Sequence, residues 1–355
     1  MKIGILTFHR AWNYGAVLQC YALQEALTSL GYDAQVIDYR QPYIEKNYKV
    51  FLFKGTVKSI LMPKKYRYLG FLHRLRILHN FKSFRNKFLK LTPPCSANNI
   101  PTDFDEYVIG SDQLWVPECM ANHFDRVYMG SFPREKNSHI ISYAISCNKR
   151  SIDKLTSQQK EEINHNFSNL SIREFSSARH LENVLNRPVN VDIDPTLLLD
   201  KSAWRKLIVN QKVHRRSYIL IYYLPGREKC LSKKDFVRKA KKIANLKRLD
   251  IVDLSNFSYS VEEFVSLISN AEIVMTTSFH GIVFSLIFNR PLIALQFHDN
   301  KDWRYVELLK MVGAENSIYK KNFSLSDFRA IDYDLVNRKL AELREHSLSY
   351  LRNAL

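Results

Sequence analysis

Short apolar runs alternate with longer amphipathic stretches from the start of the chain. Residues 2–8 form an apolar run typical of a buried parallel strand. Residues 15–30 then place Val, Leu, Ala and Tyr at helical spacing, and Gly31 marks a stop. A second apolar run covers residues 34–39. This order predicts a strand, a crossover helix and a second strand, and therefore a parallel sheet.

The same alternation continues through two halves of the chain. In the first half we predict strands at 107–109, 140–145, 170–173 and 189–194, and helices at 155–167 and from Glu174. In the second half we predict strands at 217–223, 250–254, 272–275 and 292–295, and helices at 233–244, 261–268 and 281–288. Ser260 and Glu263 have the spacing of a capping box. We therefore expect an α/β fold of two Rossmann-like, doubly wound halves facing a cleft.

The turn at Asp194-Pro195-Thr196 separates the two alternations. We place an N-terminal domain at 1–195, with a basic helical insertion at about 45–100, and a C-terminal domain at 196–335. Residues 336–355 follow as a terminal amphipathic helix.

Charge is concentrated in that insertion. The 355 residues carry a net charge of +18, yet 13 of the 53 basic residues lie between Glu45 and Asp103, where no acidic residue occurs. Three interpretations of Lys46 to Lys90 stay open: a solvated helix face, a surface that contacts an anionic membrane, or a nucleic-acid patch. No RNA-recognition, helix-turn-helix or zinc-finger pattern supports the third, so we expect no nucleic acid partner.

The cysteines and the N-terminus indicate the compartment. Five widely spaced cysteines without a C-x-x-C pair argue against a disulfide framework or a zinc ribbon. No signal peptide is evident after Met1. We expect a cytoplasmic protein, which would lie on the inner face of the plasma membrane if the insertion contacts lipid.

Polar residues follow several of the predicted strands. The stretch from Thr276 to Gly281 combines hydroxyls, His280 and a glycine between a strand and a helix, an arrangement that favours anions. The alternative is a structural histidine held by a backbone carbonyl. Asp112 is a candidate base or a helix cap, and Arg173 either binds an anion or pairs with Glu174 or another acid.

Five motifs in this order resemble the polysaccharide pyruvyl transferase family. They are residues 8–23 around Asn13-Tyr14-Gly15, Gly110-Ser-Asp-Gln113 with Trp115, Ser171-Ile-Arg-Glu174, Asp194-Pro-Thr196 and Thr276 to Gly281. The resemblance extends from residue 1 to about residue 312. It implies a fold like that of the GT-B glycosyltransferases, and transfer of the enolpyruvyl group of phosphoenolpyruvate to a sugar of a cell-surface polysaccharide, an exopolysaccharide or its lipid-linked precursor, where it closes as a pyruvate ketal.

That reaction assigns roles to the candidate residues. His280 is the expected acid and Asp112 the expected base, facing one another across the cleft with Arg173. Arg173, Ser278, Gly281 and Arg304 are the expected donor ligands in this hypothesis, and Asn13, Tyr14, Gly15, Gln19 and Gln113 are the expected acceptor ligands. Asn13 and Gly15 have the alternative of only shaping a turn. Phosphoenolpyruvate is a co-substrate; we expect no cofactor and no metal, and interpret Cys119 and His123 as structural.

One segment departs from the family pattern. Where the family commonly has Tyr-Ala-x-Ser-Phe-Gly, this chain has Tyr143-Ala-Ile-Ser146-Cys147-Asn148. The change leaves room for two other functions: a glycosyltransferase of the GT-B type that uses a nucleotide-sugar, or a binding protein without catalytic activity in polysaccharide assembly.

Overall fold

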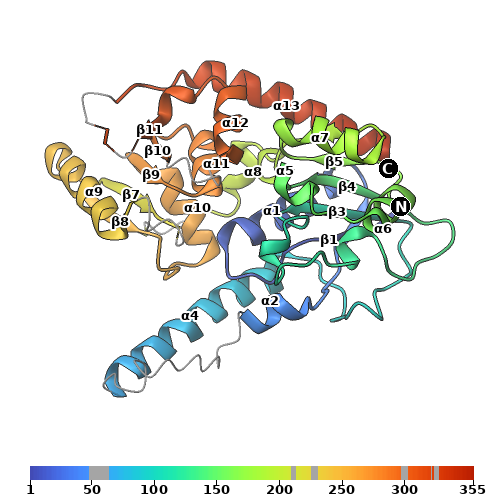
Figure 1. Cartoon of the computed structure of the whole chain (residues 1–355). Helices are drawn as coiled ribbons and strands as arrows, with labels where there is room; N and C mark the ends of the chain where they lie inside the picture. Colours follow the sequence, from blue (N-terminus) through green and yellow to red (C-terminus); the bar gives the residue numbers. More distant parts are fainter. Residues whose placement is uncertain (48–63, 209–212, 225–230, 297–302, 321, 324–327) are drawn as a thin grey trace. The chain divides into compact units, whose positions relative to one another are not determined.

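The chain forms two compact units. The computed structural model describes residues 1–47, 64–208, 213–224, 231–296, 303–320, 322–323 and 328–355. Unit 1 comprises Met1–Leu198 together with Arg344–Leu355, and unit 2 comprises Leu199–Leu343 (Figure 1). The terminal helix α13 (Tyr333–Ala354) therefore begins in unit 2 and ends in unit 1.

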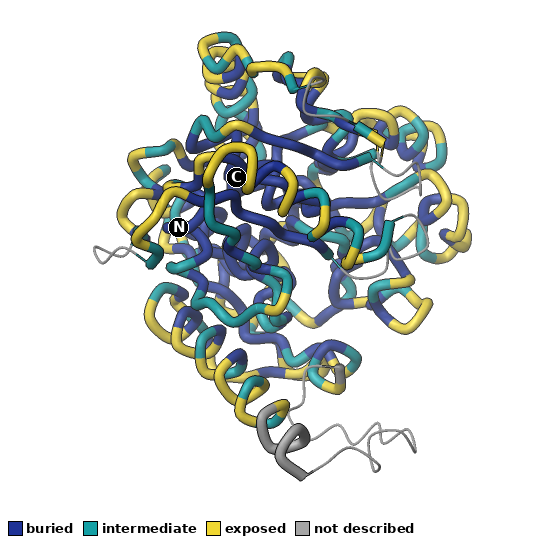
Figure 2. Tube along the Cα trace, turned by 90° about the vertical axis from the view of Figure 1, so that its left-hand side faces the viewer, coloured by how far each residue is buried: buried dark blue, intermediate teal, exposed yellow. Residues whose placement is uncertain are grey.

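Unit 1 is built on a six-stranded sheet in the order β2-β1-β3-β4-β5-β6, in which every adjacent pair is parallel. The strands are β1 (Lys2–Leu6), β2 (Asp33–Val36), β3 (Glu106–Asp112), β4 (His139–Ile145), β5 (Ser171–Ile172) and β6 (Asn190–Val191). The central strands are buried on both faces, which explains their continuous apolar runs (Figure 2). The predicted parallel sheet is confirmed.

Helices join these strands. They are α1 (Tyr14–Ser29), α2 (Pro42–Asn47), α4 (Lys64–Phe88), α5 (Lys149–Ile152), α6 (Ser157–Asn166) and α7 (Phe175–Leu185), with short 3-10 turns η1 (Pro117–Cys119), η2 (Val127–Met129) and η3 (Pro195–Leu197). Thr156 caps α6 in a capping box with Gln159. The last turns of α13 pack on unit 1, where Tyr350 donates to the carbonyl of Ser142 (2.9 Å).

The basic insertion contains a helix that packs on α1. Phe81 and Phe84 of α4 are fully buried, and their rings lie 5.4 Å from Tyr14 and 6.0 Å from Tyr21. Arg74, Arg76 and Lys82 of α4 are exposed, as are Leu72 and Leu75. Part of the predicted membrane surface, residues 48–63, lies outside the described residues. The described part is an amphipathic helix with one buried apolar face.

Unit 2 repeats the architecture with a five-stranded parallel sheet in the order β11-β10-β9-β7-β8. Its strands are β7 (Tyr218–Tyr222), β8 (Asp250–Asp253), β9 (Ile273–Thr276), β10 (Leu292–Gln296) and β11 (Ile318–Lys320). Its helices are α8 (Lys201–Arg205), α9 (Lys233–Lys247), α10 (Val261–Asn270), α11 (Phe279–Ile287) and α12 (Trp303–Met311), with η4 at Glu315–Ser317. The predicted capping box is confirmed, since Ser260 and Glu263 bond reciprocally at the start of α10.

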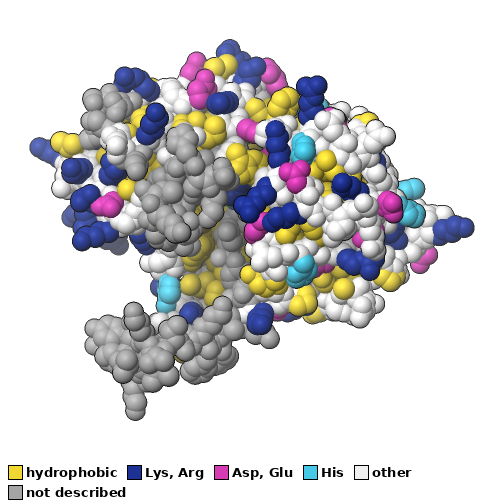
Figure 3. Space-filling model, in the orientation of Figure 1, with side chains coloured by type: hydrophobic (Ala, Val, Ile, Leu, Met, Phe, Trp, Pro, Cys, Tyr) yellow, Lys and Arg dark blue, Asp and Glu magenta, His cyan; other side chains and the backbone are white. Residues whose placement is uncertain are grey.

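Two features of unit 2 escaped the sequence analysis. The short strand β11 and the helices α8 and α12 were not predicted, because each spans too few residues to show a clear period. A second basic surface covers α9, whose sequence has seven Lys or Arg and one Asp (Figure 3). The charge of the chain is thus not confined to the insertion.

None of the helices in the described part of the chain is both long and apolar enough to cross a membrane. Cys20, Cys95, Cys119 and Cys147 are free thiols, and Cys230 lies outside the described residues.

Candidate active site

The junction between β9 and α11 holds three hydroxyls in fixed positions. Thr276 Oγ1 donates to the carbonyl of Tyr222 (2.8 Å) and accepts from the amide of Ser278 (2.9 Å). Thr277 Oγ1 accepts from the amide of Leu224 (2.9 Å), and Ser278 Oγ caps α11 by accepting from Gly281 N (3.2 Å). The hydroxyls therefore fix the backbone at the carboxyl end of β9, and Ser278 keeps a proton that it can donate.

The junction also corrects a predicted boundary. We placed the helix start at Gly281, but α11 begins at Phe279, so His280 and Gly281 belong to its first turn. A Cβ on Gly281 would lie only 2.6 Å from Thr276 Oγ1, which explains why glycine stands there. The first amides of a helix lack partners within the helix, so the start of α11 offers N–H groups next to the imidazole of His280.

His280 is 8% exposed, and its ring lies 5.1 Å from that of Phe279. The guanidinium of Arg304 lies 5.9 Å from the centroid of the Phe279 ring. Arg304 belongs to α12, an element that sequence analysis missed. The structure thus brings Arg304 to the side chain of Phe279, the first residue of α11.

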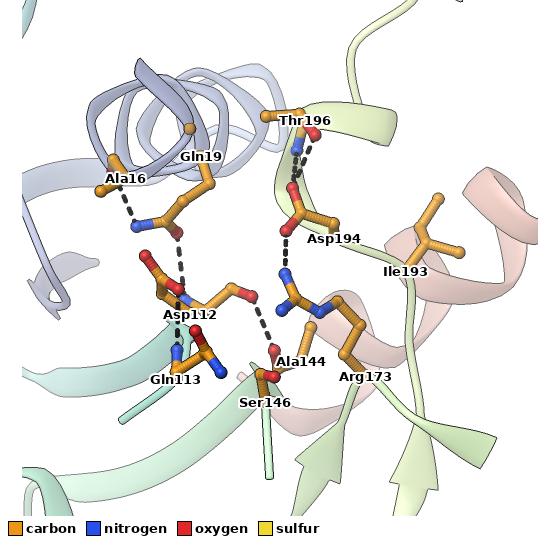
Figure 4. Close-up of polar contacts among 12 residues, drawn as sticks. Ala16, Gln19, Asp112, Gln113, Ala144, Ser146, Arg173, Ile193, Asp194 and Thr196 are labelled. Carbon is orange, nitrogen blue, oxygen red and sulfur yellow. Dashed lines mark hydrogen bonds and ion pairs between the residues drawn. The ribbon is translucent and has the colours of Figure 1, made fainter. Parts of the chain in front are cut away.

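The second candidate group lies at the carboxyl ends of β3 to β6, which we call the unit 1 carboxyl edge (Figure 4). Asp112 ends β3 with a positive φ of 76°, and its Oδ1 accepts from the amide of Gln113 (2.8 Å). Its carbonyl accepts from the amide of Ser146 at the end of β4 (2.8 Å). A Cβ on Gly110 would come within 2.0 Å of the Tyr143 carbonyl, so glycine permits the close approach of β3 to β4. Asp112 caps no α-helix.

Arg173 forms the centre of a buried ion network at this edge. Its Nε donates to Glu174 Oε1 (3.2 Å), and its Nη1 pairs with Asp194 Oδ2. Glu174 also accepts from Ser146 Oγ (2.7 Å) and from the amide of Cys147 (3.1 Å). Asp194 accepts from the amide and the hydroxyl of Thr196. The structure therefore shows the pairing of Arg173 with Glu174 that the sequence left open, and adds Asp194.

Electrostatics tie Asp112 to the same network. Burial acts to lower the pKa of Arg173, but the charges of Glu174, Asp194 and Asp112 outweigh it and raise that pKa. Arg173 and Asp112 thus lie close together in unit 1, and Arg173 stays charged. Whether they face His280 depends on both units and stays a prediction.

The predicted acceptor ligands of α1 have structural roles in unit 1. Asn13 caps α1 by accepting from Gly15 N (2.9 Å), and Tyr14 is fully buried against Phe81. Gln19 is also fully buried: it donates to Thr7 Oγ1 (2.8 Å) and accepts from Ser111 N (3.3 Å), which ties α1 to β1 and β3. Gln113 lies beside Asp112 and is partly exposed. Acceptor contact stays a prediction for these residues.

The departure from the family pattern has a local explanation. Asn148 has a φ of −118°, a conformation that needs no glycine, and its side chain caps α5 by accepting from the amide of Ser151 (2.9 Å). The loop that precedes it is held by Glu174 through Ser146 and Cys147.

Three residues of the ion network at the unit 1 carboxyl edge had no site role in the sequence analysis. They are Ser146, Glu174 and Asp194. Their place after strands β4, β5 and β6 was the available signal.

A metal centre has no candidate in the described ranges, where no three His, Cys, Asp or Glu side chains are grouped suitably. Nδ1 of His123 lies 3.5 Å from the carbonyl oxygen of Ala121.

A comparison with protein families gives one match. The model of the family described as polysaccharide pyruvyl transferase matches residues 13–299, which include every candidate site residue except Arg304. No curated protein matches the chain significantly.

Solved structures that match the chain are distant in sequence. The UDP-GlcNAc 2-epimerase of Neisseria meningitidis bound to UDP-GlcNAc is 9% identical with a TM-score of 0.49, and the match covers 100% of this chain and 94% of that one. The heptosyltransferase WaaC of E. coli with ADP-2-deoxy-2-fluoro heptose is 11% identical with a TM-score of 0.40, and the match covers 96% of this chain and 99% of that one.

Proposed function

The chain belongs to the polysaccharide pyruvyl transferase family, a family of transferases, and from that premise we propose that it transfers a pyruvyl group from phosphoenolpyruvate to a sugar of a cell-surface polysaccharide or its precursor. The product of this proposal is a cyclic pyruvate ketal across two sugar hydroxyls. The observation that carries the proposal is the junction of β9 and α11, where a histidine, a capping serine, helix amides and an arginine occur together.

Unit 2 would bind the phosphate of the donor. The amides at the start of α11 and the hydroxyl of Ser278 are suited to an anion, and Arg304 adds a full positive charge next to them. His280 would then deliver a proton to the methylene carbon of phosphoenolpyruvate. Protonation turns that carbon into a methyl group and leaves the adjacent carbon with oxocarbenium character.

Unit 1 would activate the acceptor. Asp112 would take the proton of the first sugar hydroxyl as its oxygen attacks the oxocarbenium carbon. The carbon–oxygen bond to phosphate then breaks, the second hydroxyl attacks the same carbon, and the ketal closes with release of inorganic phosphate. One hydroxyl proton ends on the new methyl group and the other on phosphate, so the reaction balances without a cofactor.

Arg173 is proposed as the partner of the donor carboxylate. Its pairs with Glu174 and Asp194 hold the guanidinium beside Asp112 at the unit 1 carboxyl edge. Arg173→Lys keeps the charge but loses the fork geometry. If Arg173 contacts the donor, this variant should raise the KM for phosphoenolpyruvate by about ten-fold, equivalent to one charge-assisted hydrogen bond. An unchanged KM would remove Arg173 from the donor site.

The direct test supplies the full chain with phosphoenolpyruvate and a panel of sugar acceptors, free and lipid-linked. Release of inorganic phosphate that depends on the acceptor, with a product of ketal mass, is the expected result. Release of a nucleoside diphosphate from a nucleotide-sugar instead would contradict the proposal. Binding of an acceptor without turnover of either donor would indicate a binding protein.

We propose in addition that α4 meets an anionic membrane surface through its exposed residues. Arg74, Arg76 and Lys82 are exposed, as are Leu72 and Leu75, and each basic group near such a surface contributes about 1 kcal/mol. Neutralising the three should weaken binding to phosphatidylserine vesicles by at least ten-fold. Unchanged binding would leave α4 as a solvated helix.

A further inference from the structure

A second polar cluster lies at the carboxyl ends of β1 and β2. Arg10 follows β1, and Asp38 and Arg40 follow β2. Asp38 accepts from Arg10 Nη1 and from Arg40 Nη2, both at 3.0 Å, and its Oδ1 lies 2.8 Å from His9 Nε2. Glu45 of α2 accepts from Arg10 Nε and lies 3.7 Å from Arg40 Nη1. Two carboxylates therefore hold two guanidinium groups side by side.

A third arginine reaches this cluster from the basic insertion. Arg85 lies in the last turn of α4 and is only 4% exposed. Its Nη1 donates to no other described residue, and the same is true of Arg40 Nε. Burial, followed by the positive charge of Arg10, lowers the pKa of Arg85 to about 10, although Asp38 and Glu45 act in the opposite direction. Three guanidinium groups thus share two carboxylates.

A buried cation with an N–H that lacks an acceptor is costly. Such a group loses its hydration without a compensating hydrogen bond, and the cost falls when an anion joins the cluster. The cluster is accessible to a ligand, because the side chains of Arg10 and Arg40 are 18% and 36% exposed. Guanidinium forks match phosphate oxygens in geometry as well as in charge.

We propose that Arg10, Arg40 and Arg85 form a binding site for a phosphate ester or diphosphate, separate from the donor site at α11. The bound group would be the phosphate of the sugar acceptor, an assignment that rests on the proposed function. Arg85 supplies a buried charge, and Arg10 and Arg40 supply the accessible N–H groups. Asp38 and Glu45 keep those two side chains in position.

The position of the site supports an acceptor rather than a donor. In unit 1, β1 lies between β2 and β3, and their carboxyl ends share one edge of the sheet with Asp112. Adjacent strands are about 5 Å apart, so the ends of β1 and β2 lie roughly 5 to 10 Å from the end of β3. That span fits a sugar whose hydroxyls reach Asp112 while its phosphate meets the arginines.

Binding of inorganic pyrophosphate to the full chain, measured by titration calorimetry, tests the site without donor or turnover. We expect saturable binding that Arg85→Met weakens by about ten-fold or more, as for loss of one charge-assisted contact. Lys87→Met, at an exposed side chain in the last turn of the same helix, should leave it unchanged. Arg40→Gln, at a partly exposed side chain, should weaken binding even if Arg85→Met fails to fold. Equal binding by wild type, Arg40→Gln and Arg85→Met would overturn the proposal.

Competition identifies the source of the phosphate. Displacement of pyrophosphate by a polyprenyl diphosphate in phosphatidylcholine vesicles would support a lipid-linked acceptor, and displacement by a soluble nucleoside diphosphate sugar a nucleotide-linked one. The two sites would not be separate if phosphoenolpyruvate displaced pyrophosphate and if His280→Ala lost pyrophosphate binding to the same extent as Arg85→Met. Because the readout is binding, an enzyme that fails to use phosphoenolpyruvate would refute the proposed function and leave this test intact.

Discussion

At the unit 1 carboxyl edge the polar groups are ionised and paired with one another, whereas at the end of β9 in unit 2 they are hydroxyls bonded to the backbone. Arg173 pairs with Glu174 and Asp194 in unit 1, and Asp112 also acts on its charge. In unit 2, Thr276, Thr277 and Ser278 hold the start of α11 without any charged partner. The same sheet architecture therefore gives one acidic edge and one edge suited to an anion.

The difference indicates how two substrates are divided. The acidic side chains at the ends of β3 to β6 repel a phosphate but can accept protons from neutral sugar hydroxyls, and the start of α11 with Arg304 favours a phosphate. The central claim is that donor phosphate is bound by unit 2 and the acceptor is activated by unit 1. Each of the following variants alters one side of this comparison.

The largest effect is expected from His280→Ala in unit 2. Loss of a general acid costs about 10² to 10⁴ in rate, so acceptor-dependent phosphate release should fall by that factor while the fold and part of the donor affinity persist. His123→Ala, at an exposed histidine, is the matched control and should retain full activity. Full turnover by His280→Ala would exclude His280 as the acid.

Asp112→Asn tests the acidic edge. Asparagine tolerates the positive φ of this position, so the fold should survive, and loss of the base should lower kcat by about 10²-fold. Asp105→Asn, at the opposite end of β3, should have no such effect. If Asp112→Asn raised the KM for phosphoenolpyruvate and left kcat intact, the assignment of a base would be wrong.

Glu174→Gln and Thr276→Val compare the two kinds of support. Removing the charge of Glu174 weakens a buried ion pair and should lower the free energy of unfolding of unit 1 by about 3 kcal/mol. Thr276→Val removes two neutral hydrogen bonds and should lower the free energy of unfolding of unit 2 by about 2 kcal/mol. Denaturant unfolding, with Glu118→Gln as an exposed-pair control, measures both. A larger effect in Thr276→Val would reverse the comparison.

The smallest effect concerns pH. Burial raises the pKa of Asp192 to about 6 against the hydrogen bonds from Ser171 and Ser347. Between about pH 4 and 6 the folded state holds a proton that the unfolded state has released, so this group lowers stability as pH rises through that window. Asp192→Asn should therefore stabilise unit 1 by about 2 kcal/mol at pH 7 and not at pH 4. Equal differences at both pH values would contradict the assignment.

Sequence patterns predicted the regular elements better than the side-chain partners. Apolar periodicity located β1, α1, β9 and most other elements within a few residues, because burial on both faces of a parallel sheet imposes it. The position of His280 after a strand was also readable. The pair of Arg173 with Asp194 was not, since it joins the ends of strands that only the sheet order brings together.

The burial of Arg85 could not be predicted from the sequence pattern either. Within a run of 13 basic residues, nothing in the local pattern distinguishes the one arginine that α4 turns towards α1 and Asp38. The signal that was available lies elsewhere, in the charged residues that follow β1 and β2. Short elements such as β11 and α12, and with α12 the approach of Arg304 to Phe279, depend on packing within unit 2.

The affinity for phosphoenolpyruvate, measured by calorimetry without acceptor, tests the division of substrates most directly. Arg304→Ala should weaken binding by about ten-fold, as expected for loss of one charge-assisted contact, with Lys310→Ala on the same helix as control. Asp112→Asn should bind phosphoenolpyruvate like the wild type. Wild-type affinity in Arg304→Ala, together with loss of binding in Asp112→Asn, would contradict the account.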